Sequence, residues 1–338
     1  MKKRHTISLL FVALMTTIVI ILPSLLVILF SSEEQAEDSP TKQTGESSLE
    51  EESAVEVAVY RSASKQTETY PLEEYVAGVI AAEMPAEFEK EALKAQALTA
   101  RTFIVKQMMN GKTVNGKEAH VTDTVNHQVF KTKAELQDIW GEDFDWKYEK
   151  VREAVQETAG QVITYNGEPI TASFFSTSNG YTENAEEYWS ESLPYLKSVE
   201  SPWDQESPKY TSRKTMSLSE FESKLGVSVK GKNEAGTIKG RTSGNRIAAI
   251  EIGGKELTGR EVREKLDLPS SDFSWVLKGD DVVITTKGYG HGVGMSQYGA
   301  NGMAQEGKDH KDIITHYYQQ TEIEEVDQVI GKQITAKK

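Results

Sequence analysis

The chain contains no cysteine among its 338 residues. Disulfide bonds, thiolate metal ligands and thiol nucleophiles are therefore excluded. It also has no lysine- or arginine-rich block, and its formal net charge is -14. Because nucleic-acid binding relies on basic groups that displace phosphate counterions, this charge argues against a nucleic-acid partner. A ligand that needs no positively charged binding surface, such as a neutral sugar backbone, fits the chain better.

Charge is also absent from residues 7–30, an apolar run of 24 residues. This length is sufficient to cross a bilayer core of about 30 Å. Three basic residues precede the run and acidic residues follow it, so the positive-inside rule places the N-terminus in the cytoplasm and the remaining chain outside. Bulky side chains continue to Phe30, where a cleaved signal peptide would end in small residues, so we expect an uncleaved single-pass anchor. A long signal peptide is the alternative, and in either case the bulk of the chain is exported.

The remaining chain divides by composition. Residues 31–54 are rich in Ser, Glu, Thr and Gln without apolar periodicity, which predicts a disordered acidic tether. Residues 55–325 should form one catalytic module with two lobes, and residues 326–338 a C-terminal tail. Helical and strand patterns follow one another irregularly, which favours an α+β fold over a doubly wound parallel sheet.

Periodicity and turn residues predict the main elements of this module. A helix should begin near Pro71 or Leu72 and stop near Met84, because Pro85 disfavours helical geometry in the residue before it. Asn166 and Gly167 indicate a hairpin between strands at 162–165 and 170–175. Further helices are expected at 88–109, 149–158, 217–225 and 258–265, and further strands at 54–60, 67–70, 247–252 and 282–286.

Glu83 lies in the last turn of the helix that stops near Met84. The partial negative charge at a helix C-terminus and the apolar residues before Glu83 both disfavour its ionised form, so its pKa should be raised. A carboxylic acid that stays protonated near neutral pH is what general-acid chemistry on a sugar oxygen requires. From this local pattern alone, a half-exposed helix-end glutamate without a function is an open alternative.

Four separated segments carry a family resemblance. They are Ala-Ala-Glu-Met-Pro at 81–85, Glu-Ala-Leu-Lys-Ala-Gln-Ala at 91–97 with Arg101 after it, Phe-Ser-Thr-Ser-Asn-Gly at 175–180, and the glycine-rich segment 288–297. In this order they resemble the stage II sporulation protein D family, also called SpoIID/LytB, over roughly residues 55–325. The members that this chain resembles are lytic transglycosylases that cleave peptidoglycan glycan strands during engulfment in spore-forming bacteria. Their catalytic acid is the Glu of Glu-Met-Pro, a role that the resemblance assigns to Glu83.

The resemblance implies non-hydrolytic cleavage between N-acetylmuramic acid and N-acetylglucosamine, with a 1,6-anhydro product. Hydrolysis is the near alternative, with Glu183 as the best candidate for the second carboxylate that ordinary glycosidases need. A non-catalytic wall-binding module that stimulates an amidase is the alternative from another class. By resemblance, the partners are peptide-free glycan strands, the membrane amidase stage II sporulation protein P and the membrane protein stage II sporulation protein M, and the expected location is the mother-cell membrane facing the septal space.

Arg101 is the strongest candidate for a second site residue. A guanidinium in the middle of an apolar helix must be paired or face a cleft. A structural salt bridge is the alternative, but the resemblance favours contact with substrate or orientation of Glu83. Lys94 falls on the same helix face as Arg101 and is the weaker candidate.

Other candidate substrate-binding residues supply hydrogen-bonding or aromatic groups suited to sugars. Tyr181 belongs to an aromatic cluster at 181–203 that can stack on pyranose rings, although clustered aromatic residues more often form a core. The others in this set are Ser176, His291, Gln297 and Tyr298.

The alternate glycines at 288–294 match neither the dinucleotide fingerprint nor a phosphate loop. They suit a place where a ligand or another backbone approaches closely. His120, Asp123 and His127 have spacings that a metal could use. Zinc-binding relatives carry cysteines in this segment, and this chain has none, so we expect neither a metal nor another cofactor.

Overall fold

The computed structural model describes residues 55–111, 114, 116–229 and 236–329. The expected anchor at 7–30 and the expected tether at 31–54 lie outside this part of the chain. Within the described ranges, none of the helices combines the length and apolarity that a bilayer span requires. The described elements mix helices and short sheets, so the expected α+β class is confirmed.

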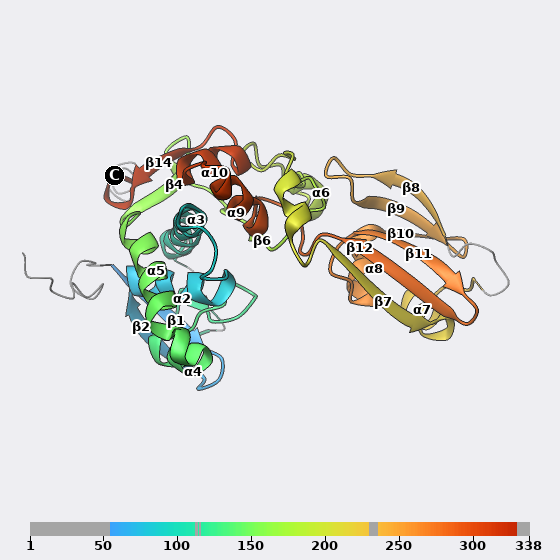
Figure 1. Cartoon of the computed structure of the whole chain (residues 1–338), viewed down its shortest axis with the longest axis horizontal. Helices are drawn as coiled ribbons and strands as arrows, with labels where there is room; N and C mark the ends of the chain where they lie inside the picture. Colours follow the sequence, from blue (N-terminus) through green and yellow to red (C-terminus); the bar gives the residue numbers. More distant parts are fainter. Residues whose placement is uncertain (1–54, 112–113, 115, 230–235, 330–338) are drawn as a thin grey trace, which may run out of the picture. The chain divides into compact units, whose positions relative to one another are not determined.

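The first part of the fold packs helices against a small sheet. Strands β1 (Glu56–Arg61) and β2 (Gln66–Pro71) are antiparallel, and β3 (Val121–Thr122) pairs with β1 in parallel. Helix α2 (Leu72–Glu83) follows β2 directly and packs against α3 (Lys90–Met109) (Figure 1). Helices α4 (Lys133–Trp140) and α5 (Phe144–Gln156), joined by the 3₁₀ turn η1 (Gly141–Asp143), complete this part.

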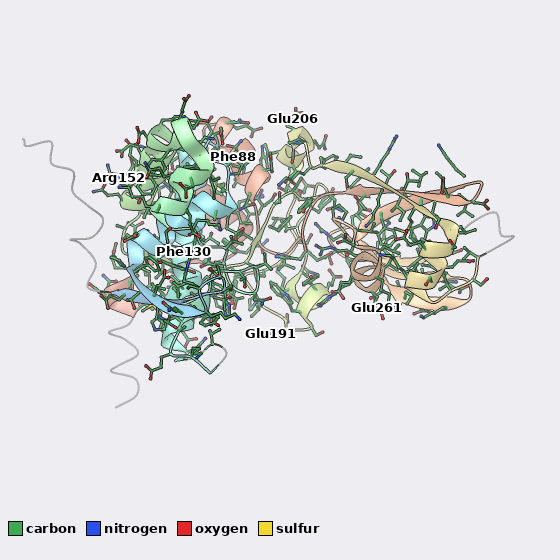
Figure 2. The ribbon with its side chains drawn as sticks, turned by 90° about the horizontal axis from the view of Figure 1, so that it is seen from below. Phe88, Phe130, Arg152, Glu191, Glu206 and Glu261 are labelled. Carbon is green, nitrogen blue, oxygen red and sulfur yellow. The ribbon has the colours of Figure 1, made fainter. Side chains whose placement is uncertain are left out.

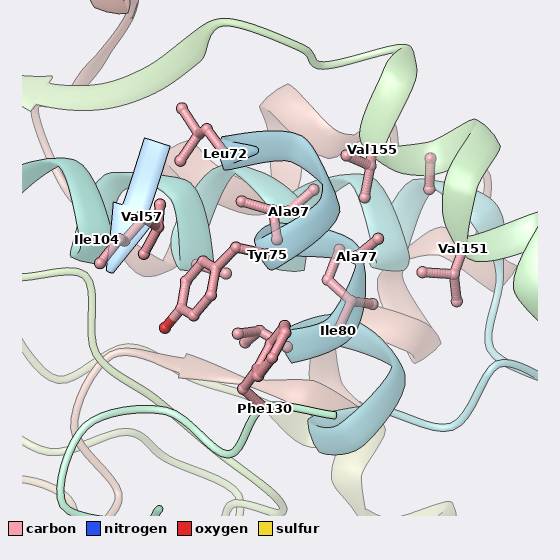
Figure 3. Packing of buried hydrophobic residues seen from close by; sticks show 14 of the residues in the cluster. Val57, Leu72, Tyr75, Ala77, Ile80, Ala97, Ile104, Phe130, Val151 and Val155 are labelled. Carbon is pink, nitrogen blue, oxygen red and sulfur yellow. The ribbon is translucent and has the colours of Figure 1, made fainter. Parts of the chain in front are cut away.

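Helix α2 ends where the sequence predicts. Met84 has an extended backbone, and its N–H still donates to the Ile80 carbonyl at 2.9 Å. The apolar residues of α2 point into the first core, where Tyr75 and Ile80 lie beside Phe130 and Val151 (Figure 3). Glu83 is therefore held at the end of a helix that is fixed by packing along its length.

The second part joins distant segments of the chain. The hairpin of β4 (Gln161–Tyr165) and β5 (Glu168–Pro169) turns at Asn166 and Gly167, whose φ values of 54° and 78° suit a two-residue turn. Strand β14 (Glu322–Glu325) pairs with β4 on its other side. Other elements are α6 (Ala185–Trp189), the 3₁₀ turn η2 (Pro202–Glu206), α9 (Gln297–Gln305) and α10 (His310–Tyr317).

The prediction of one continuous strand at 170–175 is wrong. The chain leaves the hairpin after the Ile170 N–H donates to the Ile163 carbonyl. Residues 174–175 form β6 (Phe174–Phe175), which pairs in parallel with β13 (Met295–Ser296). Periodicity cannot distinguish one strand from two short pieces that pair with different partners.

The third part has its own core and is formed by residues 211–287. One sheet has the order β11-β12-β7 and the other β10-β9-β8. Phe221, Ile250 and Ile284 are among the buried residues between these sheets and two short helices, and Figure 2 shows Glu261 on this part. The elements are β7 (Thr211–Ser217), α7 (Leu218–Leu225), β8 (Thr237–Arg241), β9 (Ile247–Ile252), β10 (Lys255–Thr258), α8 (Gly259–Leu266), β11 (Asp272–Lys278) and β12 (Asp281–Lys287).

The glycine-rich segment runs closely alongside residues 173–179. A Cβ atom on Gly294, where φ is 82°, would lie 2.0 Å from the Ser173 carbonyl oxygen. A Cβ atom on Gly292 would lie 2.3 Å from the Arg246 guanidinium carbon. The glycines therefore allow a close approach of backbone and side chains, as the sequence predicts.

The folded part extends beyond the expected boundary at residue 325. Val326 and Val329 are buried in the first core. These residues pack with the helices and do not belong to a tail.

Candidate active site

Glu83 lines a pocket of about 300 Å³. Its walls come from the end of α2, from α3, from the loop after β3, from the segment before β6, from the end of α6 and from the glycine-rich segment. The lining residues are Glu83, Phe103, Val125, His127, Gln128, Thr171, Ala172, Ser173, Phe174, Trp189 and His291.

Two hydrogen bonds fix Glu83. The Val129 N–H donates to its carboxylate Oε1 at 2.9 Å, and the Gln297 side-chain Nε2 donates to its backbone carbonyl at 3.0 Å. Burial raises the pKa of Glu83 above its usual value, while the Val129 N–H acts in the opposite direction. The carboxyl group is therefore positioned and biased toward the protonated form.

His291 forms a neutral wall of the pocket. Burial, together with the charges of Arg263 and Arg246, lowers its pKa to about 3. The Val293 N–H donates to Nδ1 at 3.0 Å, and the ring also has a hydrogen bond with the backbone of Phe174. Because a neutral imidazole has one donor and one acceptor nitrogen, both are used within the protein. His291 is therefore placed to shape the pocket and not to transfer protons.

Aromatic rings gather around His291. The centroid of the Trp189 ring lies 5.7 Å from the imidazole, and that of Tyr188 lies 5.5 Å from it. Trp189 is 37% exposed and lines the pocket, so one ring remains accessible to a ligand. Tyr181, the aromatic residue predicted to bind substrate, is 38% exposed but does not line this pocket.

The predicted role of Arg101 in the cleft is contradicted by its position. Its side chain is fully buried, and its Nε donates to both carboxylate oxygens of Glu73, at 2.9 and 3.1 Å. The terminal nitrogens donate to the carbonyls of Val155 and Gln161, both at 3.2 Å. A guanidinium enclosed in this way cannot reach a ligand, so the salt-bridge alternative describes Arg101 correctly.

Lys94 does not face the pocket either. Its ammonium pairs with Glu91 at 2.8 Å and with Glu157 at 3.2 Å. The helix face that carries Lys94 therefore packs toward the end of α5. Its prediction as a substrate-binding residue is wrong for the same reason as that of Arg101.

The other predicted residues, Ser176, Gln297 and Tyr298, are not among those that line the pocket. The Tyr298 N–H donates to the Ser176 carbonyl at 3.1 Å, and the Tyr298 ring contacts Phe88 with a centroid distance of 4.9 Å. Gln297 holds the end of α2 through its hydrogen bond to the Glu83 carbonyl. Of these residues, Gln297 therefore supports the helix that carries Glu83.

Glu183 is held outside the pocket. It is 2% exposed, and it accepts hydrogen bonds from the Gly244 N–H at 2.9 Å and from the Thr242 hydroxyl. An Arg246 guanidinium nitrogen lies 3.7 Å from its carboxylate. Burial and a hydrogen bond with Glu187 raise the pKa of Glu183 to about 7, while the three groups above act in the opposite direction. Its carboxylate therefore joins the second and third parts of the fold and does not face Glu83.

The histidines considered for a metal have other partners. The Ala58 N–H donates to His120 Nδ1 at 3.0 Å, and His127 Nδ1 lies 2.9 Å from the Thr122 hydroxyl. Asp123 accepts the Ser62 N–H at 3.0 Å. Across the described ranges, no group of three or more His, Asp or Glu side chains is placed to hold a metal ion.

Most of the pocket wall comes from residues that the sequence does not single out. Phe103, Thr171 and Trp189 come from three elements, and no local pattern links them. The loop at 123–128 carried a signal, because polar residues and one histidine, His127, follow a short strand there without a helical or strand period. The spacing of its residues was considered for a metal, which was not assigned, and the loop supplies a wall of the pocket.

Comparison with known proteins gives the following relatives. A family model described as stage II sporulation protein matches residues 60–165. The chain is 54% identical to stage II sporulation protein D of Bacillus subtilis (strain 168), over 84% of this chain and 83% of that protein. It is 53% identical to stage II sporulation protein D of Bacillus amyloliquefaciens, over 85% of this chain and 83% of that protein. It is 30% identical to the amidase enhancer of Bacillus subtilis (strain 168), over 71% of this chain and 39% of that protein.

Proposed function

This chain belongs to the stage II sporulation protein D family, and from that premise we propose that it is a lytic transglycosylase. Its substrate is the glycan strand of peptidoglycan, and the bond cleaved joins N-acetylmuramic acid to N-acetylglucosamine. Glu83 is the catalytic residue.

One observation carries this proposal. Among the described residues that line the pocket, Glu83 alone has a carboxyl group. Ordinary glycosidases place a second carboxylate about 5–10 Å from the first, as nucleophile or as base for water. Glu183, the best candidate for that role, is bonded elsewhere. A single acid in a partly buried pocket suits a reaction in which one carboxyl group serves both proton transfers.

Protonated Glu83 donates its proton to the glycosidic oxygen while the bond from that oxygen to C1 of the muramyl residue breaks. The resulting carboxylate then accepts the proton of the C6 hydroxyl of the same residue as O6 bonds to C1. One proton passes from O6 to the leaving oxygen through Glu83, and no water is consumed. The accessible Trp189 ring offers a face for a pyranose, and neutral His291 closes the wall behind it.

A second candidate function is a non-catalytic wall-binding module that stimulates an amidase. The similarity to the amidase enhancer of Bacillus subtilis (strain 168) favours it. Analysis of products separates the candidates. Purified protein incubated with peptide-free glycan strands, without an amidase, should release 1,6-anhydromuramyl ends detectable by mass spectrometry. Products heavier by one water would indicate a hydrolase. Unchanged strands would indicate the non-catalytic binding module.

The cellular setting is part of the proposal. Residues 7–30 would anchor the chain in the mother-cell membrane, with the catalytic part facing the septal space. Stage II sporulation proteins P and M would be its membrane partners. An amidase such as the former would supply strands without peptides.

The rate of cleavage should depend on pH through Glu83. The first step requires the protonated acid, so the rate should fall as pH rises through the pKa of Glu83, which burial raises above the ordinary value of about 4.3. His291 is neutral throughout the range from about pH 5 to 8 and should add no inflection there. The measurement is kcat/KM on soluble strands from pH 4 to 9. An activity that increases with pH across this range would contradict the role of Glu83 as acid.

Chelators should leave cleavage intact, because the histidines near the pocket have partners within the protein. The measurement compares the rate before and after incubation with EDTA and dialysis. Loss of activity that zinc restores would require His120 and His127 to be ligands.

A further inference from the structure

Lys106 places a cation at the edge of the pocket. Its ammonium donates to the Thr171 hydroxyl oxygen at 2.9 Å, and Thr171 lines the pocket. Phe103, one turn earlier on α3, lines the pocket as well. The ammonium therefore lies one hydroxyl group away from the space that a substrate would occupy.

This ammonium has no carboxylate within 4.0 Å among the described residues. The other cations of α3 differ, because Lys90 and Lys94 pair with Glu157 and Arg101 pairs with Glu73. Lys106 is thus the cation of this helix that lacks an anion from the chain.

Leaving Lys106 without a counter-ion is unfavourable. Burial lowers its pKa, and the charges of Glu191 and Glu168 oppose this effect from beyond ion-pair distance. Both glutamates are exposed, so water screens them. An anion that arrives with the substrate would provide the missing partner in a less screened position.

Lys106 and Thr171 lie next to each other, and both keep hydrogen-bond donors for a ligand. The Thr171 hydroxyl accepts one proton of Lys106 and retains its own O–H to donate. Lys106 has two further N–H groups. A carboxylate next to both would accept charge-assisted hydrogen bonds, which are about twice as strong as neutral ones.

We propose that Lys106 and Thr171 form a subsite for the lactyl carboxylate of a muramyl residue. This inference rests on the proposed function, because it takes the glycan strand as ligand. The lactyl group is a free carboxylate when the peptide has been removed, and it is a neutral amide when the peptide is attached. Lys106 is then a specificity residue that favours peptide-free strands by charge, while the lactyl group takes no part in bond cleavage.

Binding of two chemically matched strands tests the subsite. The probes are peptide-free strands with free lactyl carboxylates and the same strands with these groups converted to methylamides. The full chain carrying Glu83→Gln is used so that the strands are not cleaved. We expect the free-acid strand to bind about tenfold more tightly, the effect of one charge-assisted hydrogen bond. Equal affinity for both strands would overturn the proposal without any further variant.

Lys106→Met, in the same Glu83→Gln background, should weaken binding of the free-acid strand about tenfold and leave the methylamide strand unaffected. Lys106→Arg should retain most of the preference. Lys224→Met is the matched control, because Lys224 lies on α7 and pairs with Glu220. A Lys106→Met variant that keeps the preference overturns the proposal, as does one that weakens both strands equally.

These outcomes are separable from the proposed function. Anhydro products without a carboxylate preference would support the transglycosylase and remove the subsite. A preference that depends on Lys106, in a chain that yields no anhydro products, would support the subsite in a wall-binding module.

Discussion

Glu83→Gln should abolish nearly all glycan cleavage, with a loss of about 10²–10⁴-fold in rate, the usual contribution of a general acid–base group. The amide can neither donate a proton to the leaving oxygen nor accept one from the C6 hydroxyl. It keeps the shape of the side chain and a carbonyl oxygen that can accept the Val129 N–H, now bonded to the carboxylate at 2.9 Å. The fold should therefore be retained. The measurements are the rate of release of anhydromuramyl ends and the thermal melting curve of the same sample.

Glu87→Gln is the matched control. Glu87 lies a few residues further on, is exposed, and pairs with Lys147 at 2.9 Å outside the pocket. A surface pair contributes about 0–1 kcal/mol to the free energy of unfolding, so the control should fold and cleave normally. If Glu83→Gln kept the wild-type rate, Glu83 could not be the acid. A loss of rate in both variants would indicate a general effect of charge on strand binding.

The position of Glu83 could be predicted because its causes are local. Pro85 ends the helix, and the apolar residues before Glu83 bury its last turn, so both the helix boundary and the direction of the pKa shift follow from neighbours in the sequence. The two short helices of residues 211–287 and the strands β9 and β12 were predictable for the same reason. Their caps and periods lie within each element, as in the capping box of Thr258 and Glu261.

The surroundings of Glu83 could not be predicted in this way. Val129, which bonds its carboxylate, is 46 residues away, and Gln297, which bonds its backbone, is 214 residues away. A helical period indicates which residues share a face but not what that face meets. For this reason Arg101 and Lys94 appeared suited to a cleft, although their face meets α2 and α5.

Lys106 illustrates the same limit. In the sequence it is one more lysine in the second half of a helix, and the helical period favours Lys94 instead, because Lys94 shares a face with Arg101. The difference lies in distant partners, because Lys94 meets Glu157 whereas Lys106 meets Thr171 at the pocket. The partner of each buried charged side chain therefore has to be read from the folded structure.

Arg101→Ala should lower the free energy of unfolding by about 3–5 kcal/mol, the usual cost of removing one partner of a buried ion pair. The alanine favours the helix, so the loss comes from the groups left behind. Glu73 is 6% exposed, and after the loss of the guanidinium it would retain the hydrogen bond from the Gly160 N–H, at 3.1 Å. The carbonyls of Val155 and Gln161 would also lose a donor. Denaturant unfolding curves measure the change.

Two comparisons decide whether this role is structural. Arg152→Ala, which removes a partly exposed guanidinium from α5, should change stability by less than about 1 kcal/mol, because its partner Glu149 stays solvated. Arg101→Met combined with Glu73→Leu should recover part of the lost stability, since no charge then remains buried without a partner. Below its lowered melting temperature, Arg101→Ala should still cleave strands, because the guanidinium does not line the pocket. If Arg101→Ala melted like the wild type but had lost cleavage, Arg101 would have a role in the active site and not in stability.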